Sequence, residues 1–149
     1  MENQKLINFL NQLLSNYFVM YVKLHRYHWY IQGPHFFELH EKFEEMYDVF
    51  ADDIDEIAER VLMIGGRPLA VMEKYLKETT LEEATADDTE KEMISQLNKD
   101  YKQIVDEIKD MGMPLAEENK DEPTTDLLIS LQSKLEKYIW MLTAYQADK

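Results

Sequence analysis

The sequence predicts an all-α fold, an antiparallel bundle of four long helices. Apolar residues recur at steps of three and four along four long segments, which is the spacing of a helix face turned to a core. Only four glycines and four prolines interrupt the 149 residues. Hydrophobic residues make up 45% of the chain, enough for a core in a chain of one domain's length. We therefore expect residues 1–149 to form a single domain.

The first helix is predicted over residues 3–30. Its apolar stripe consists of Leu6, Leu10, Leu13, Tyr17, Met20, Leu24 and Tyr27. Further apolar and aromatic residues widen this stripe, so the helix should pack on more than one side.

The second helix is predicted between the Gly33-Pro34 break and the Gly65-Gly66 stop, and it carries two distinct faces. Its core stripe consists of Leu39, Phe43, Met46, Phe50, Ile54, Ile57, Val61 and Ile64. A second face, about 100° round the helix, consists of His40, Glu44, Tyr47, Ala51, Asp55, Ala58, Glu59 and Leu62. Because this face mixes small and apolar residues with His and carboxylates, we expect another surface to cover it.

The remaining elements follow a long connection that contains a short helix over residues 70–77. The third long helix should begin at Thr89 or Glu90, since Thr89 and Glu92 match a capping box, and end at Met111 with Gly112 as its stop. Its expected inward residues are Met93, Leu97, Tyr101, Ile104, Ile108 and Met111. A loop over residues 113–123 leads to the last helix, over residues 124–145, with Leu128, Leu131, Leu135, Tyr138, Leu142 and Tyr145 on its core face. Four helices with a short helix in one long crossover describe the ferritin-like connectivity.

Charge and composition limit the classes of function. The net charge of −14 argues against a general nucleic-acid binder, which needs a Lys/Arg surface. Cysteine is absent, which excludes disulfides and thiolate metal sites. The sequence shows no secretory leader and no run of about 18 apolar residues. We expect a cytoplasmic protein without a membrane segment.

Two pairs of polar residues on the second helix have metal-ligand spacing. His40 and Glu44, and likewise Asp55 and Glu59, are four residues apart, so each pair projects to one place. Imidazole and carboxylate suit iron, zinc or manganese. Glu44 and Asp55 lie about 16 Å apart along the helix, whereas metal–ligand bonds are about 2 Å. A shared site therefore needs a second, antiparallel copy of the helix across a two-fold axis, and His28 could fold back as a further ligand.

The bundle interior offers no alternative metal site in this sequence. Ferritin-like di-iron proteins use Glu-x-x-His motifs inside the bundle, but this chain has none, and the predicted inward positions are apolar. Iron chemistry is thus expected at an interface between chains. The alternative is a purely structural helical oligomer in which His40, Glu44, Asp55 and Glu59 form interfacial salt bridges.

The chain resembles the Dps mini-ferritins over nearly its whole length, in residues 23–68 and again in residues 125–145. The resemblance implies a four-helix subunit, a hollow dodecamer and ferroxidase sites at two-fold interfaces. The ligands it implies are His28, His40 and Glu44 from one subunit with Asp55 and Glu59 from its partner. Trp29 would be the aromatic neighbour of the site. Glu44 departs from the family pattern, which usually has Asp there, but it remains an oxygen ligand.

The activity implied by the resemblance is iron storage and detoxification by a ferroxidase. Two Fe(II) ions would bind per site and be oxidised by hydrogen peroxide, or more slowly by oxygen, and Fe(III) would mineralise in the cavity, which protects against oxidative stress. Zinc is a possible substitute for iron. Asp121 and Asp126 are candidates for an acidic iron-uptake pore, although a merely solvated acidic loop would explain them equally well.

DNA binding is expected to be weak or absent. Family members that bind DNA directly usually use a mobile Lys/Arg-rich tail, whereas the first nine residues here contain one lysine. A negative shell should repel DNA. The alternative function is a DNA-protecting, nucleoid-compacting oligomer with weak iron chemistry.

Overall fold

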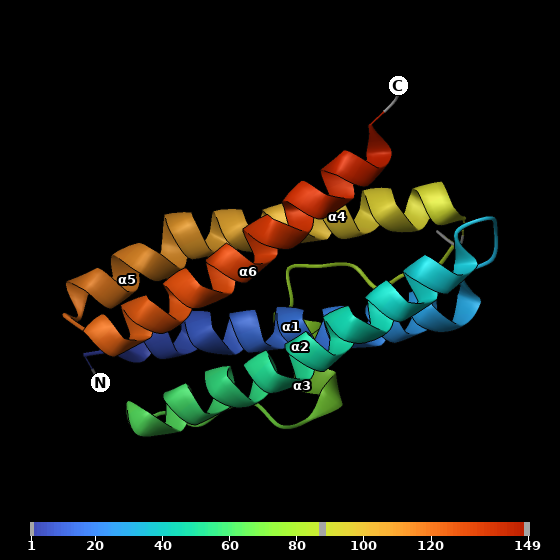
Figure 1. Cartoon of the computed structure of the whole chain (residues 1–149). Helices are drawn as coiled ribbons and strands as arrows, with labels where there is room; N and C mark the ends of the chain where they lie inside the picture. The colour runs from blue at the N-terminus through green and yellow to red at the C-terminus, as the bar shows by residue number, and fades with distance from the viewer. Residues whose placement is uncertain (1, 87–88, 148–149) are drawn as a thin grey trace.

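The computed structural model describes residues 2–86 and 89–147, and its main feature is an antiparallel bundle of four long helices (Figure 1). These helices are α1 (Gln4–Tyr30), α2 (Phe36–Met63), α4 (Glu90–Glu107) and α6 (Glu122–Gln146). Helix α1 packs against α2, and α4 packs against α6. The short helix α3 (Met72–Glu78) lies in the connection between α2 and α4 and packs on α1. The described residues include no strand, and the predicted all-α, ferritin-like arrangement is confirmed.

The predicted apolar stripes form the core. All seven stripe residues of α1 are at most 1% exposed, and those of α2 are buried from Leu39 to Val61. Tyr17 stacks on Phe50 with ring centroids 4.6 Å apart, which joins α1 to α2. Among the described residues, no helix is long and apolar enough to cross a membrane.

Helix α4 begins as predicted. The Thr89 side chain accepts a hydrogen bond from the Glu92 backbone N–H at 3.2 Å, and the Thr89 N–H donates to the Glu92 carboxylate at 3.4 Å. This reciprocal capping box satisfies two backbone donors that the helix leaves unpaired.

The predicted stop at Gly112 is wrong. A π-helical turn, η1 (Ile108–Gly112), leads directly into α5 (Met113–Glu118), and α6 already begins at Glu122, so helix occupies most of the expected loop. Gly112 has an ordinary helical φ of −67°, and a Cβ there would lie 2.5 Å from the Phe9 ring. The glycine therefore permits close packing on α1. Because a π turn shifts the helix phase, Met111 is 43% exposed instead of facing the core.

The interior is also less apolar than predicted. The Lys23 ammonium on α1 lies 2.8 Å from the Asp100 carboxylate on α4, and both residues are 3% exposed. Gln96 donates a further hydrogen bond to Asp100 at 2.8 Å. A similar but half-open pair joins buried Asp53 on α2 to Lys134 on α6 at 2.8 Å. These ion pairs tie together helices that are distant in sequence.

Replacing Lys23 with Met should destabilise the subunit by about 3–5 kcal/mol, because it removes the buried ammonium that lies 2.8 Å from the Asp100 carboxylate. The shift of the urea unfolding midpoint measures this loss. A Lys23→Met/Asp100→Leu variant removes both charges and should recover much of the stability. A midpoint unchanged in the single variant would contradict a stabilising pair.

Candidate metal centre

The connection over residues 31–35 brings His28, near the end of α1, against His40, in the first turns of α2. Their rings stack with centroids 3.7 Å apart and an interplanar angle of 12°. Nδ1 of His28 lies 2.6 Å from the backbone oxygen of His40, and Nδ1 of His40 lies 2.7 Å from that of His28. Each imidazole is thus held by the backbone of the other residue.

These reciprocal hydrogen bonds fix the tautomer that each ring adopts when it is neutral. A carbonyl oxygen only accepts, so Nδ1 of each ring must carry the proton and donate it. In the neutral imidazole Nε2 is then the unprotonated nitrogen with a free lone pair. Metal-binding histidines are commonly oriented in this way by a carbonyl on the other nitrogen. His28 and His40 are therefore prepared as two Nε2 donors.

Glu44, one turn after His40, adds an oxygen donor to this pair. Its Oε1 lies 3.7 Å from Nε2 of His28. That separation is too long for a hydrogen bond. Two ligands that bind one metal at about 2.0–2.2 Å each lie about 3–4 Å apart, so the gap suits a shared cation. The Glu44 side chain is 55% exposed, whereas that of His28 is 8% exposed, so the carboxylate faces outward.

Aromatic rings line one side of the histidine pair. Tyr47 on α2 contacts the His28 ring edge-on at 5.4 Å and stacks on His25 at 3.8 Å. Burial, and then the nearby charge of Glu44, raises the pKa of Tyr47, which stays a neutral phenol. Trp29 lies beyond, with its ring 5.4 Å from His25, and is 67% exposed. The ring contacts of His25 were not foreseen, because it has no carboxylate at helical spacing.

Asp55 and Glu59 do not join this group within the chain. Both are exposed and lie about three turns farther along α2. In residues 2–86 and 89–147, no group of three or more His, Asp or Glu side chains is arranged to hold a metal ion. The predicted five-ligand site therefore depends on a second copy of the chain.

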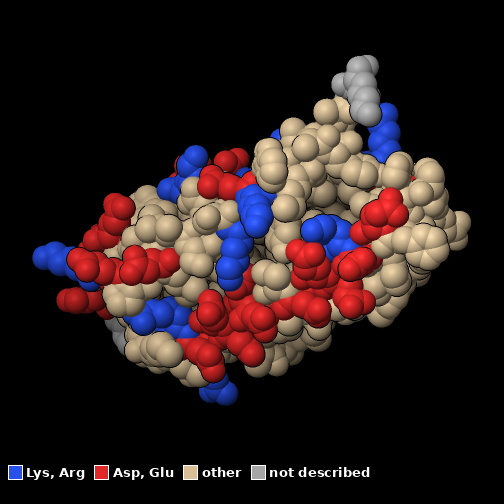
Figure 2. Space-filling view, in the orientation of Figure 1, with Lys and Arg blue, Asp and Glu red and all other residues tan. Residues whose placement is uncertain are grey.

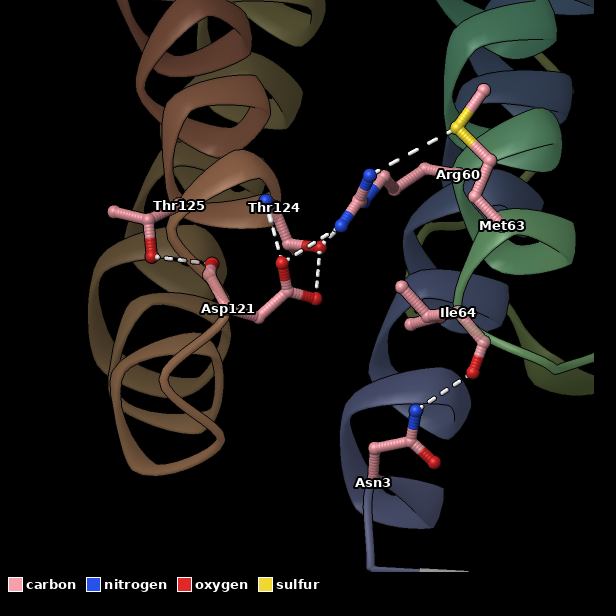
Figure 3. A network of polar contacts seen from close by, with 7 residues as sticks. All are labelled: Asn3, Arg60, Met63, Ile64, Asp121, Thr124 and Thr125. Atoms are coloured by element: carbon pink, nitrogen blue, oxygen red, sulfur yellow. Dashed lines mark hydrogen bonds and ion pairs between the residues drawn. The ribbon is translucent and has the colours of Figure 1, made fainter.

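The start of α6 shows what the predicted pore residues do within the subunit (Figure 3). Asp121 caps α6 by accepting hydrogen bonds from the backbone N–H of Thr124 at 3.1 Å and its hydroxyl at 2.6 Å. Arg60 on α2 donates to the same carboxylate at 2.8 Å and to the Thr124 hydroxyl at 2.8 Å. Burial alone would raise the pKa of Asp121, but these bonds outweigh it and lower the pKa. Asp126, by contrast, is exposed.

Replacing Asp121 with Ala should cost about 1–2 kcal/mol of stability, because α6 loses its cap and Arg60 loses its ion pair. Since folding lowers the pKa of Asp121, its contribution is complete above the unfolded pKa of about 3.9 and disappears as the pH falls through the folded-state pKa. Urea unfolding at pH 7 and at pH 3 measures both effects. The exposed Asp126→Ala change should stay within about 0.5 kcal/mol; equal losses in the two variants would contradict the capping role.

Comparison with known proteins identifies the class of protein to which this chain belongs. A family profile described as a ferritin-like domain matches residues 7–148. Together with the crossover bundle, it defines the chain as a ferritin-like protein. The DNA protection during starvation protein 2 of Bacillus anthracis is 46% identical over 143 residues, covering 96% of this chain and 97% of that protein.

Solved structures agree with this relationship. The crystal structure of Dps from Staphylococcus aureus has a TM-score of 0.95 and 34% identity, covering 98% of this chain and 97% of that chain. The Dps protein of Vibrio cholerae O1, described as a member of a broad superfamily of ferritin-like diiron-carboxylate proteins, has a TM-score of 0.93 and 39% identity, covering 98% and 91%. The chain belongs to the Dps family.

Proposed function

We propose that this protein is a ferroxidase that stores and detoxifies iron in the cytoplasm. The single observation that carries the proposal is the fixed histidine pair, in which each Nδ1 is held by a backbone carbonyl and Nε2 of His28 lies 3.7 Å from Glu44. Each site would take His28, His40 and Glu44 from one subunit with Asp55 and Glu59 from a second copy, and would bind two Fe(II) ions as substrate. Zn²⁺ accepts the same nitrogen and oxygen ligands and would compete.

The reaction uses hydrogen peroxide in preference to oxygen. Two Fe(II) ions supply the two electrons that reduce one peroxide to water: 2 Fe²⁺ + H₂O₂ + 2 H⁺ gives 2 Fe³⁺ + 2 H₂O. Holding both ions at one site avoids the one-electron reduction that releases hydroxyl radical, and this is how the protein would protect against oxidative stress. The Nδ1 hydrogen bonds keep His28 and His40 in the binding tautomer throughout.

The uncovered face of α2 supports the two-fold interface. Ala51 and Ala58 are half-buried there, and Leu62 and Met63 are 59% and 71% exposed in the subunit. Exposed apolar side chains of this kind are typical of interfaces. An antiparallel α2 pair would cover them and carry Asp55 and Glu59 to the histidines of the other copy. Twelve such subunits would form the hollow dodecamer.

Acidic side chains support the storage of cations. Figure 2 shows Asp and Glu gathered over α2 on the face turned to the viewer. The exposed acidic residues of this helix are Glu38, Glu41, Glu44, Glu45, Asp48, Asp52, Asp55, Glu56 and Glu59. Such a field attracts Fe(II). At the start of α6, Asp126 is the freer pore candidate, because Asp121 is held by Arg60 and Thr124.

Oxidation of Fe(II) by the metal-free protein, followed optically with peroxide or air, tests the proposal, together with the particle mass in solution. We expect a dodecamer-sized particle that consumes Fe(II) faster than buffer, faster with peroxide than with air, and that keeps the ferric product soluble. A particle of that size that oxidises Fe(II) no faster than buffer would contradict the ferroxidase activity but not the fold.

Direct DNA protection is a weaker candidate, because the net charge of −14 opposes phosphate binding. We expect no mobility shift of duplex DNA at pH 7 without divalent cations. The same assay with added Mg²⁺ serves as the comparison, since a cation could bridge two negative surfaces. A shift without cations would favour the DNA-protecting alternative.

A further inference from the structure

Three side chains of types that can bind metals, from distant parts of the chain, meet at the end of the bundle, and none of them belongs to the histidine pair. His35 lies in the connection between α1 and α2, Glu90 in the first turn of α4, and Tyr145 in the last turn of α6. Nδ1 of His35 is 2.7 Å from Oε1 of Glu90 and 3.0 Å from the Tyr145 hydroxyl. The Tyr145 hydroxyl also donates a short hydrogen bond to Oε1 of Glu90.

The spacing of these donors resembles one face of an octahedral metal site. Neighbouring ligands that bind a metal at about 2.0–2.2 Å lie about 3 Å apart in that geometry. Two sides of the triangle, from Nδ1 of His35 to the two oxygens, match this spacing, whereas the Tyr145–Glu90 side is shorter, so these two oxygens would have to move apart around an ion. Because a carboxylate only accepts, Nδ1 of His35 and the Tyr145 hydroxyl each carry a proton in this network. A metal ion bound here would replace both: the phenol proton passes to water, and the imidazole shifts through solvent to the tautomer whose proton is on Nε2, which frees Nδ1 as a ligand.

The backbone is shaped to hold the Glu90 carboxylate in this place. Gly33 adopts a φ of +136°, which side chains rarely tolerate, and a Cβ at Gly33 would collide with Oε2 of Glu90. The His35 backbone N–H donates to the same oxygen at 3.4 Å. The His35 side chain is 50% exposed and that of Glu90 only 17%. The cluster therefore has a fixed carboxylate and an open side through which an ion and water ligands could enter.

The charge state of the cluster also suits a cation. Burial alone would raise the pKa of Glu90, but hydrogen bonds from Tyr145 and His35 outweigh it and lower the pKa, so Glu90 is ionised at neutral pH. Burial, followed by the hydrogen bond and charge of Glu90, raises the pKa of Tyr145. Without a metal the phenol thus stays protonated, and a strongly polarising ion is needed to displace its proton.

We propose that His35, Glu90 and Tyr145 form a second metal site that binds Fe(III). One imidazole with carboxylate and phenolate oxygens is a hard donor set, which favours a trivalent ion over Fe(II). Water molecules complete the coordination on the exposed side. The site binds the oxidised form of iron, whereas the pair of His28 on α1 and His40 on α2 takes the reduced form. Its existence does not rest on the proposed ferroxidase activity, because Fe(III) can be supplied directly.

Tyrosinate bound to Fe(III) absorbs visible light by charge transfer, and carboxylate-bound ferric mineral lacks this tyrosinate band. The assembled, metal-free protein is titrated with Fe(III) nitrilotriacetate and followed by visible absorption, with resonance Raman spectra excited in the new band. We expect one equivalent per chain to produce the band together with tyrosinate ring vibrations. Tyr145→Phe should abolish the band, and Glu90→Gln should weaken binding at least about 10-fold.

Two matched variants identify the source of the band. Tyr30→Phe removes another half-exposed tyrosine, at the end of α1, and should leave the band unchanged. The His28→Ala/His40→Ala variant should also keep it, because Fe(III) is added already oxidised. No band in the wild type, a band that survives Tyr145→Phe, or a band lost with His28 and His40 would each overturn the proposal. A Tyr145→Phe variant that only unfolds more easily, beside a colourless wild type, would mean that the cluster is a structural hydrogen-bond network.

Discussion

Replacing His28 and His40 together with Ala should lower the rate of Fe(II) oxidation by at least about 100-fold, while the particle keeps its mass. Losing only the outer hydrogen-bond partner of a metal ligand costs about 10–100-fold, and this variant removes two of the ligands themselves. Stopped-flow absorbance with peroxide measures the rate, and light scattering measures the mass.

The control is His25→Phe, which removes a neighbouring histidine but keeps an aromatic ring against Tyr47. It should retain most of the oxidation rate. If the double variant oxidised Fe(II) normally in an intact particle, the histidine pair would be a packing feature. If the particle itself fell apart, the structural alternative of an interfacial salt-bridge network would gain support.

Much of the fold could be predicted from the spacing of apolar residues, because a helix that buries one face has apolar residues at every third or fourth position. The prediction that a helix ends at Gly112 was wrong because glycine has two different structural uses. It ends helices, but it also permits close approach, and only the position of the Phe9 ring in space distinguishes them. The expected core position of Tyr145 was wrong for a related reason. It is 42% exposed in the last turn of α6 and binds Glu90 and His35.

The site was predictable in its residue types and its spacing, but not in its detail. Helical spacing pairs His40 with Glu44, whereas the fold-back of His28 and the reciprocal carbonyl hydrogen bonds depend on the path of residues 31–35. The Lys23–Asp100 pair was missed because its members are 77 residues apart, and no local pattern links them. The contribution of Asp55 and Glu59 remains a prediction, because it depends on a second copy of the chain.

Two inactive variants should restore activity when they assemble together, and this is the sharpest test of the shared site. One variant, His28→Ala/His40→Ala, lacks the histidine half, and the other, Asp55→Asn/Glu59→Gln, lacks the acidic half. Each should be inactive alone. A site takes its histidines from one subunit and its carboxylates from the neighbouring subunit. In an equal mixture, a site is therefore intact when the Asp55→Asn/Glu59→Gln subunit supplies the histidines and the His28→Ala/His40→Ala subunit supplies the carboxylates. Random assembly gives about one quarter intact sites.

The two variants would be co-expressed with different affinity tags, and particles that carry both tags would be purified. We expect them to oxidise Fe(II) at about one quarter of the wild-type rate per subunit, and particles of either variant mixed after assembly to stay inactive. Within one chain, Glu44 and Asp55 are about 16 Å apart on a rigid helix. A site built from a single chain would therefore gain no activity from co-assembly. A mixed particle as inactive as the two variants alone would contradict the two-fold site but not the ferritin-like fold.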